Sequence, residues 1–224
     1  MTQYSYTCLN SQSDLMIAEW AFSSHEACCT DVLPDGCCDI ILEKPVGQAP
    51  TLFVSELGES AYTVSTPAGT SIQGMRLHPG VQIRQAEMRS WLEGKNPAEI
   101  FDVDQLSEFC VKSDNLSSAL ACLESDKQSV QNAAKELGVS LRTLERLVKS
   151  GTGRTPYFWF SLARIRRTAR SLYGAKSLGE AALDAGFTDQ SHMNREMNRW
   201  FGKTPAQIAK DDYIRSILLE AGYG

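Results

Sequence analysis

The chain has 224 residues and a formal net charge of −5, and its length suits two domains of about 100 residues each. The average charge argues against a nucleic-acid-binding protein, but the charge is unevenly distributed. Residues 1–128 carry a net −11, residues 129–210 carry +8 and the rest carry −2. A basic patch confined to one domain is the electrostatic pattern expected for phosphate binding.

The lack of a recognisable targeting signal and the cysteine content both predict a cytoplasmic location. The first residues lack a basic region followed by an apolar run, so we expect no signal peptide. No segment approaches the roughly 20 apolar residues that span a bilayer, so we expect no membrane partner. Seven cysteines, an odd number, predict reduced thiols rather than a disulfide framework.

Residues 1 to about 80 alternate short apolar runs with turn residues, which predicts antiparallel β-structure. The runs are DLMIAEWAF, CCDIILEK, PTLFVSEL and SIQGMRL, with an LPDG turn at Leu33–Gly36. From Val81 the apolar spacing lengthens, which predicts helix to about Leu92 and again over 103–123. The polar stretch over 125–129 predicts a linker. We therefore expect a sensor or dimerisation domain at 1–124, a linker at 125–128, a second domain at 129–210 and a tail at 211–224.

The last hundred residues contain the same pattern twice, first over 133–156 and again over 181–205, the second copy being one residue longer at the start of its second helix. In each copy an Ala-rich helix stops at a glycine that can be left-handed, a hydroxyl residue caps a second helix, and that helix ends at Gly-x-Thr-Pro. Such a pair is a helix-turn-helix, whose second helix can enter the major groove of DNA. The residues concerned are Gly138 and Gly186, the caps Ser140 and Thr188, and the closing Gly153-Arg154-Thr155-Pro156 and Gly202-Lys203-Thr204-Pro205.

Between the copies, residues 156–173 predict one long helix with Pro156 in its first turn. A helix of about 17 residues is ~26 Å long, comparable with the ~34 Å turn of B-DNA. It could therefore hold the two second helices over successive major-groove segments. Its aromatic residues are expected to pack in the core: Tyr157, Phe158, Trp159 and Phe160. The inward faces of the second helices are expected to carry Leu144, Leu147, Met193 and Met197.

Residues 129–210 resemble the DNA-binding domain of the AraC/XylS family of bacterial transcription regulators. The most specific part is AALDAGFTDQSHMNREMNRWFGKTPAQ, with Gly-Phe in the turn, Asp-Gln-Ser-His opening the second helix and Phe-Gly-x-Thr-Pro closing it. The first copy departs from the family at Val148, where an aromatic residue is usual. The resemblance implies an all-α domain with two recognition helices, which binds asymmetric double-stranded DNA sites near promoters, contacts RNA polymerase and usually activates transcription.

Carried over by position, the resemblance assigns base reading to one face of each second helix. The chemistry agrees, because Arg can bond guanine bidentately, Gln and Asn suit adenine, and Glu can accept from cytosine. The base-reading candidates are Arg142, Glu145, Arg146, Gln190, Ser191, His192, Asn194 and Arg195. The candidates for phosphate contact are Ser140, Arg154, Thr155, Arg166, Lys203 and Thr204. The alternatives are a solvated face for the arginines, a local salt bridge for Glu145 and a surface role for His192.

The first 80 residues resemble the small β-barrel, cupin-like sensor domains that precede this module in the family. The residues that carry this resemblance are the LPDG-Cys turn and the element Arg76-Leu77-His78-Pro79-Gly80. The chain is therefore expected to be an α+β protein, an antiparallel β-barrel-like domain with flanking helices followed by two helix-turn-helix units joined by a long helix. The resemblance also implies a small-molecule or ion effector and dimerisation, and Arg76 and His78 are candidate effector residues.

The cysteines support an alternative, a soft-metal or redox-sensing regulator. The candidate thiol-sensing or metal-ligating residues are Cys28, Cys29, Cys37 and Cys38, with His25 nearby. Neighbouring residues of a strand point to opposite faces, and a hairpin around Pro34-Asp35 would place Cys37 opposite Val32 and Cys29 opposite Ile40. We therefore favour buried structural cysteines and expect no cofactor.

A third hypothesis is a thiol alkyl-transfer enzyme that uses the helix-turn-helix for targeting. Only three histidines are present, and none forms a recognised motif with a cysteine and an acid. We therefore expect a transcription regulator rather than an enzyme, in which a β-rich sensor domain controls a basic domain that reads DNA.

Overall fold

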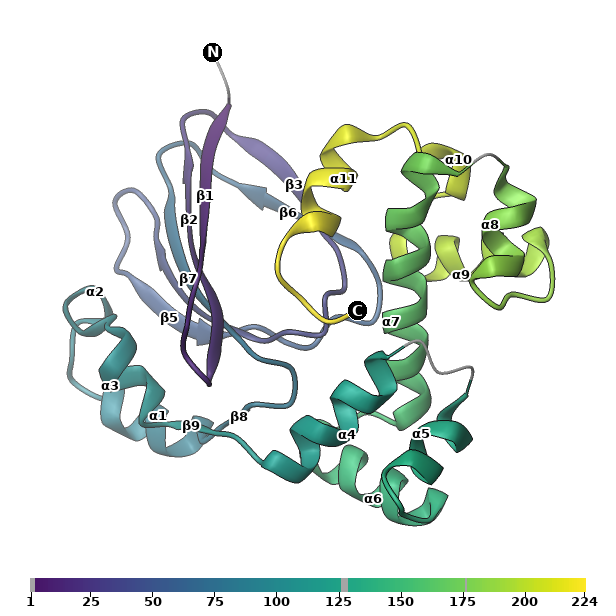
Figure 1. Cartoon of the computed structure of the whole chain (residues 1–224). Helices are drawn as coiled ribbons and strands as arrows, with labels where there is room; N and C mark the ends of the chain where they lie inside the picture. Colours follow the sequence, from purple (N-terminus) through teal and green to yellow (C-terminus); the bar gives the residue numbers. More distant parts are fainter. Residues whose placement is uncertain (1–2, 126–128, 176) are drawn as a thin grey trace. The chain divides into compact units, whose positions relative to one another are not determined.

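The computed structural model describes residues 3–125, 129–175 and 177–224 (Figure 1). By their internal contacts these residues form two compact units. The predicted α+β organisation, a β-rich part followed by an all-α part, is confirmed. The β unit comprises residues up to Val32, Cys37–Leu57 and Thr63–Ser113, and the helical unit comprises Leu33–Gly36, Gly58–Tyr62 and Asp114–Gly224.

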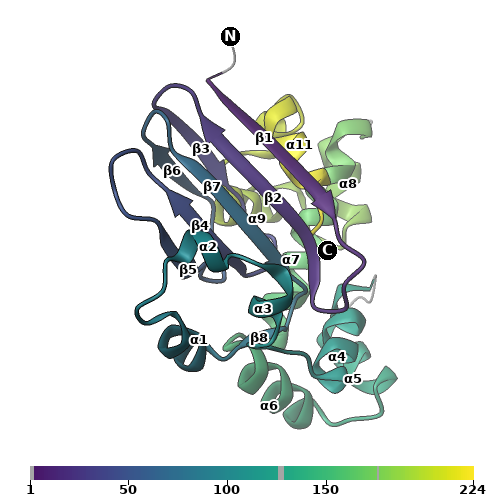
Figure 2. The same cartoon turned by 90° about the vertical axis from the view of Figure 1, so that its left-hand side faces the viewer.

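The β unit contains a five-stranded antiparallel sheet with the order β1-β2-β7-β4-β5 (Figure 2). Its strands are β1 (Tyr4–Asn10), β2 (Met16–Ser24), β4 (Asp39–Lys44), β5 (Thr51–Val54) and β7 (Ser71–Leu77). Along β2, Met16, Ala18 and Phe22 are buried at even spacing, so this strand turns one face to the core. Two further strands, β3 (Cys28–Val32) and β6 (Tyr62–Thr66), pair in a separate sheet.

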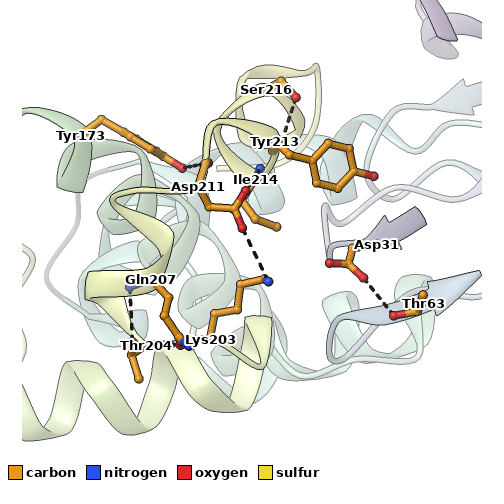
Figure 3. Close-up of polar contacts among 10 residues, drawn as sticks. All are labelled: Asp31, Thr63, Tyr173, Lys203, Thr204, Gln207, Asp211, Tyr213, Ile214 and Ser216. Carbon is orange, nitrogen blue, oxygen red and sulfur yellow. Dashed lines mark hydrogen bonds and ion pairs between the residues drawn. The ribbon is translucent and has the colours of Figure 1, made fainter. Parts of the chain in front are cut away.

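The hairpin predicted around Pro34-Asp35 is wrong. β3 and β4 belong to different sheets, so Cys29 does not pair with Ile40, which instead faces Met75 and Val54. A bond between Asp31 and Thr63 ties β3 to β6, with Thr63 Oγ1 donating to the carboxylate at 2.9 Å (Figure 3). The LPDG residues do not close a two-stranded hairpin, because Leu33–Gly36 pack within the helical unit.

Three short helices follow the sheet: α1 (Gln85–Leu92), α2 (Pro97–Ile100) and α3 (Val103–Ser107). Met88 of α1 and Leu106 of α3 are buried in one cluster with apolar residues of the sheet. The helix predicted from Val81 to about Leu92 begins only at Gln85, because Gln82–Ile83 is a strand, and the helix predicted over 103–123 is interrupted by a strand. The chain leaves α3 to form β9 (Cys110–Val111), which pairs with β8 (Gln82–Ile83), before α4 (Asp114–Glu124) begins.

The helical unit begins earlier and ends later than the predicted DNA-binding domain. α4 buries Leu116, Leu120 and Leu123 within this unit rather than in the predicted first domain. Residues 211–224, predicted as a tail, form α11 (Asp212–Leu219) and a packed end, in which Tyr223 is buried and donates from its hydroxyl to the Leu120 carbonyl at 2.8 Å. Of the predicted linker, 126–128 lie outside the described residues.

The central helix of this unit is α7 (Pro156–Ser171), with α5 and α6 beside its first turns and α8 beside its last (Figure 1). Trp159 and Phe160 are buried as predicted, and Phe158 packs on Trp200 with ring centroids 5.3 Å apart. Tyr157 was predicted in the core but is 58% exposed, because it lies on the outer face of α7. The remaining helices are α5 (Val130–Glu136), α6 (Leu141–Thr152), α8 (Leu178–Asp184), α9 (Gln190–Phe201) and α10 (Pro205–Ile208), with a 3-10 turn at Leu172–Gly174.

Candidate nucleic-acid interface

The first helix pair, α5 and α6, forms as the sequence predicts. Gly138 adopts a left-handed φ of 67° in the turn, a conformation that other residues rarely adopt. Ser140 is the N-cap of α6, and its hydroxyl accepts from the Thr143 backbone N–H at 3.1 Å. Leu144 and Val148 are fully buried, so Val148 fills the inward position despite its departure from the family. The opposite face of α6 is left to solvent.

That exposed face of α6 carries the predicted reading residues. Arg142, Glu145 and Arg146 are all exposed, and within the described part of the chain none of their side chains forms a hydrogen bond or ion pair. Lys149 is also exposed, one helical turn after Glu145, and was not among the candidates. The i, i+3, i+4 spacing from Arg142 and Arg146 would have identified it. α6 therefore presents three cations and one carboxylate on a single face.

The second helix pair, α8 and α9, differs from the prediction at its cap. Gly186 has the expected left-handed φ of 73°, but the N-cap of α9 is Asp189 rather than Thr188. The Asp189 carboxylate accepts from the His192 backbone N–H at 2.7 Å. The residue that lengthens this copy lies between Gly186 and the cap, so α9 begins one position later relative to its glycine.

Only part of the predicted reading set on α9 faces solvent. Gln190, Ser191 and Arg195 are exposed. His192 packs its ring edge-on against Phe187, with centroids 5.2 Å apart, and its Nδ1 lies 3.1 Å from the Thr188 hydroxyl.

The Asn194 side chain is turned inward, and its Oδ1 is buried without a hydrogen-bond partner among the described residues. His192 and Asn194 are half-buried, and their contacts with bases remain predictions. Asn198 and Arg199 were missed, although both are exposed at helical spacing from Arg195.

Three of the predicted phosphate contacts are helix caps. The Thr155 hydroxyl accepts from the Phe158 N–H at 3.2 Å at the start of α7. The Thr204 hydroxyl accepts from the Gln207 N–H at 3.3 Å in a capping box at the start of α10. The Ser140 hydroxyl likewise accepts from a backbone N–H at the start of α6. Each hydroxyl therefore already satisfies a backbone donor at a helix N-terminus.

The two equivalent cations of the repeat, Arg154 and Lys203, are each paired with a carboxylate. Arg154 forms an ion pair with Glu59. Lys203 Nζ lies 3.6 Å from the Asp211 carboxylate, and the Asp211 carbonyl accepts from the Tyr173 hydroxyl at 3.1 Å (Figure 3). Both cations are predicted phosphate contacts, whereas neither partner is predicted, because the partners lie outside the repeat.

The phosphate contact predicted for Arg166 is wrong. Arg166 is 1% exposed on the inner face of α7, and its Nη1 donates to the Pro34 carbonyl at 3.1 Å. The Tyr223 backbone N–H donates to the neighbouring Asp35 carbonyl at 2.7 Å. Arg166 therefore holds the LPDG turn within the helical unit and does not face a duplex.

In the β unit, Arg76 of the second predicted sensor motif pairs with a residue that follows the LPDG turn. Asp39, three residues after the LPDG turn, lies opposite Arg76 in the β4–β7 register, and the two form an ion pair at 3.3 Å. Trp20 Nε1 donates to the same carboxylate at 2.9 Å. His78, a candidate effector residue, forms two backbone hydrogen bonds. Its N–H donates to the Leu15 carbonyl, and its carbonyl accepts from the Val81 N–H.

The candidate cysteines do not form a metal-binding cluster. Cys28 and Cys37 are buried, Cys38 is half-buried, and Cys29 is exposed with its sulfur 3.4 Å from the Ser65 hydroxyl. Among the described residues, no group of three or more His, Cys, Asp or Glu side chains could hold a metal ion. Burial raises the pKa of the Cys110 thiol to about 11, which keeps it protonated and a poor nucleophile at neutral pH.

Comparisons with known proteins found a family model and several relatives that match part of the chain. A model of a helix-turn-helix domain matches residues 133–211. The virulence regulon transcriptional activator VirF of Yersinia enterocolitica is 36% identical over 75 residues, 33% of this chain and 28% of that protein. The transcriptional activator RhaS of Escherichia coli is 30% identical over 106 residues, 45% of this chain and 38% of that protein. This chain therefore spans well under half the length of these relatives.

A solved structure is also similar to part of the chain. It is a transcriptional regulator with an AraC-type DNA-binding domain from Chromobacterium violaceum, 27% identical, covering 48% of this chain and 95% of that one at a TM-score of 0.39. In the described parts of the chain, no helix is both long and apolar enough to cross a bilayer.

Proposed function

We propose that this protein, whose helical unit resembles the DNA-binding domains of the AraC/XylS family and matches a helix-turn-helix model over residues 133–211, is a sequence-specific transcription regulator. The observation that carries the proposal is the pair of solvent-facing helices α6 and α9. Each buries one apolar face and exposes polar side chains on the other. Both flank α7, which keeps them in one compact unit. A second helix held in this way can enter the major groove.

The exposed residues of the two helices suit direct base recognition. Arg142, Arg146 and Arg195 can each donate two hydrogen bonds to guanine, and Gln190 suits adenine. Each good pair discriminates against a wrong base by about 1–3 kcal/mol. Lys149 and Arg199 add positive charge for phosphate contact. We infer that Arg142, Glu145 and Arg146 read one half-site and that Gln190, Ser191 and Arg195 read the other.

Regulation is inferred from the β unit and from the relatives. VirF and RhaS are both named as transcriptional activators, so we propose activation, with RNA polymerase as a partner. We assign the β unit to sensing an effector and to dimerisation, and we place the protein in the cytoplasm with its DNA. The buried ion pair of Asp39 with Arg76 stabilises β4 against β7, so Arg76 is assigned to structure within that unit.

The test is selection of duplexes from a random pool by the full-length protein, followed by footprinting on the selected site. We expect protection of two successive major-groove segments on one face, about 10 base pairs apart. Affinity should fall steeply as salt rises, because bound cations displace counterions from DNA. Arg195→Ala should weaken binding to the selected site by about tenfold or more.

Arg89→Ala provides the matched control, because Arg89 is an exposed arginine of α1 outside the helix-turn-helix units. Its substitution should leave operator affinity unchanged. A protein that selects no preferred sequence at low salt would defeat the proposal.

A further inference from the structure

Residues Gly58–Tyr62, which we name the strap, join β5 to β6 in the sequence but belong to the helical unit by their contacts. The Ala61 backbone N–H donates to the Trp200 carbonyl at 2.8 Å, in the last turn of α9. The Glu59 carboxylate pairs with Arg154, which follows the end of α6. The strap therefore contacts the ends of both recognition helices at once.

Arg154 is held where α6, α7 and α9 meet. The Thr152 hydroxyl accepts from the Arg154 backbone N–H at 3.1 Å and from Trp159 Nε1 at 3.0 Å. The Arg154 guanidinium lies 5.5 Å from the ring centroid of Phe158, which packs on Trp200. The arginine side chain therefore lies beside the first turn of α7.

The equivalent cation of the second copy has a different kind of partner. Asp211, which pairs with Lys203, is fixed in place because its carboxylate also caps α11 by accepting from the Ile214 N–H at 3.1 Å (Figure 3). In the pair of Arg154 with Glu59, the side chains are 33% and 61% exposed. An exposed ion pair of this kind contributes little net stability and exchanges readily with another anion.

We propose that the strap is a switch on DNA binding, in which Glu59 occupies Arg154 until a DNA phosphate replaces it. This inference rests on the proposed function and names how it is regulated. The strap runs into β6 at Tyr62 and is joined to β5 by residues 55–57, so a change in the β unit that displaces it alters the availability of Arg154. Because Ala61 holds the end of α9 as well, the same displacement reaches the second recognition helix.

The test compares Glu59→Gln with Glu56→Gln in the full-length protein. Glu56 is an exposed carboxylate three residues earlier, outside the strap, so its substitution removes the same charge and controls for general repulsion of DNA. Duplex binding is measured by fluorescence anisotropy across a salt series. We expect Glu59→Gln to raise affinity about threefold, as for the loss of one competing exposed ion pair, and Glu56→Gln to change it much less. The gain should shrink as salt screens the pair.

The partner variant completes a double-mutant cycle. Arg154→Met should lower affinity and abolish the gain from Glu59→Gln. Equal gains in the two glutamine variants, or a Glu59→Gln gain that persists beside Arg154→Met, would overturn the switch while leaving the proposed function intact. Failure of every variant, wild type included, to bind any duplex would instead defeat the proposed function.

A readout without DNA tests the strap directly. In the free protein, the pair of Glu59 with Arg154 and the bond from Ala61 both hold the strap. Hydrogen exchange at the Ala61 amide should therefore quicken in Glu59→Gln and stay at the wild-type rate in Glu56→Gln. The same Ala61 exchange rate in both variants would show that Glu59 does not anchor the strap.

Discussion

Among individual residues, Arg166 carries its charge in a buried position, where a charged group needs a hydrogen-bonding partner. Its guanidinium is buried and donates to the Pro34 carbonyl. Removing a buried donor leaves the acceptor unsatisfied, which costs about 1–3 kcal/mol. Arg166→Met, which keeps most of the side-chain volume, should therefore lower the free energy of unfolding by about that amount in urea denaturation.

The matched control for that prediction is Arg142→Met on the exposed face of α6. It should change the free energy of unfolding by less than about 0.5 kcal/mol and weaken DNA binding instead. The opposite pattern, with Arg166→Met sparing stability and reducing the salt dependence of DNA binding, would restore Arg166 as a phosphate contact.

At the scale of elements, features that depend on neighbouring residues were predictable from the sequence, and contacts between segments distant in the sequence were not. The helix-turn-helix units were predictable because their glycines, caps and Thr-Pro starts act within a few residues. The exposed faces of α6 and α9 followed from helical spacing. The pairing of β3 with β6 was not predictable, because it joins segments some 30 residues apart, as between Asp31 and Thr63. The burial of Arg166 likewise depends on Pro34, 132 positions away.

The cap of α9 provides a prediction for one element. The Asp189 carboxylate satisfies a backbone donor of the first turn, and Thr188 does not. Asp189→Ala should lower the free energy of unfolding by about 1 kcal/mol. Thr188→Ala removes only an exposed contact with His192 and should cost less than about 0.5 kcal/mol. Thermal denaturation followed by circular dichroism measures both, and a larger loss for Thr188→Ala would reassign the cap.

In the whole molecule, the two units differ in net charge and in the chain segments that form them. Most of the excess positive charge lies between residues 129 and 210, and the first 128 residues repel DNA with a net −11. The strap and the LPDG turn leave the β-strands and pack in the helical unit. In the helical unit, the strap pairs with Arg154 and the LPDG turn accepts a hydrogen bond from Arg166.

The last prediction follows from the unlike faces of α6 and α9. Because α7 packs against both helices, each chain should read two different half-sites in a fixed order, without a palindrome. Operators with single base-pair changes should show Arg146→Ala relaxing discrimination only at one end and Arg195→Ala only at the other, by about 1–3 kcal/mol at the contacted position. The effects of the two variants should add, since the residues share no partner. If both variants relax the same base pairs, then one helix alone reads the operator.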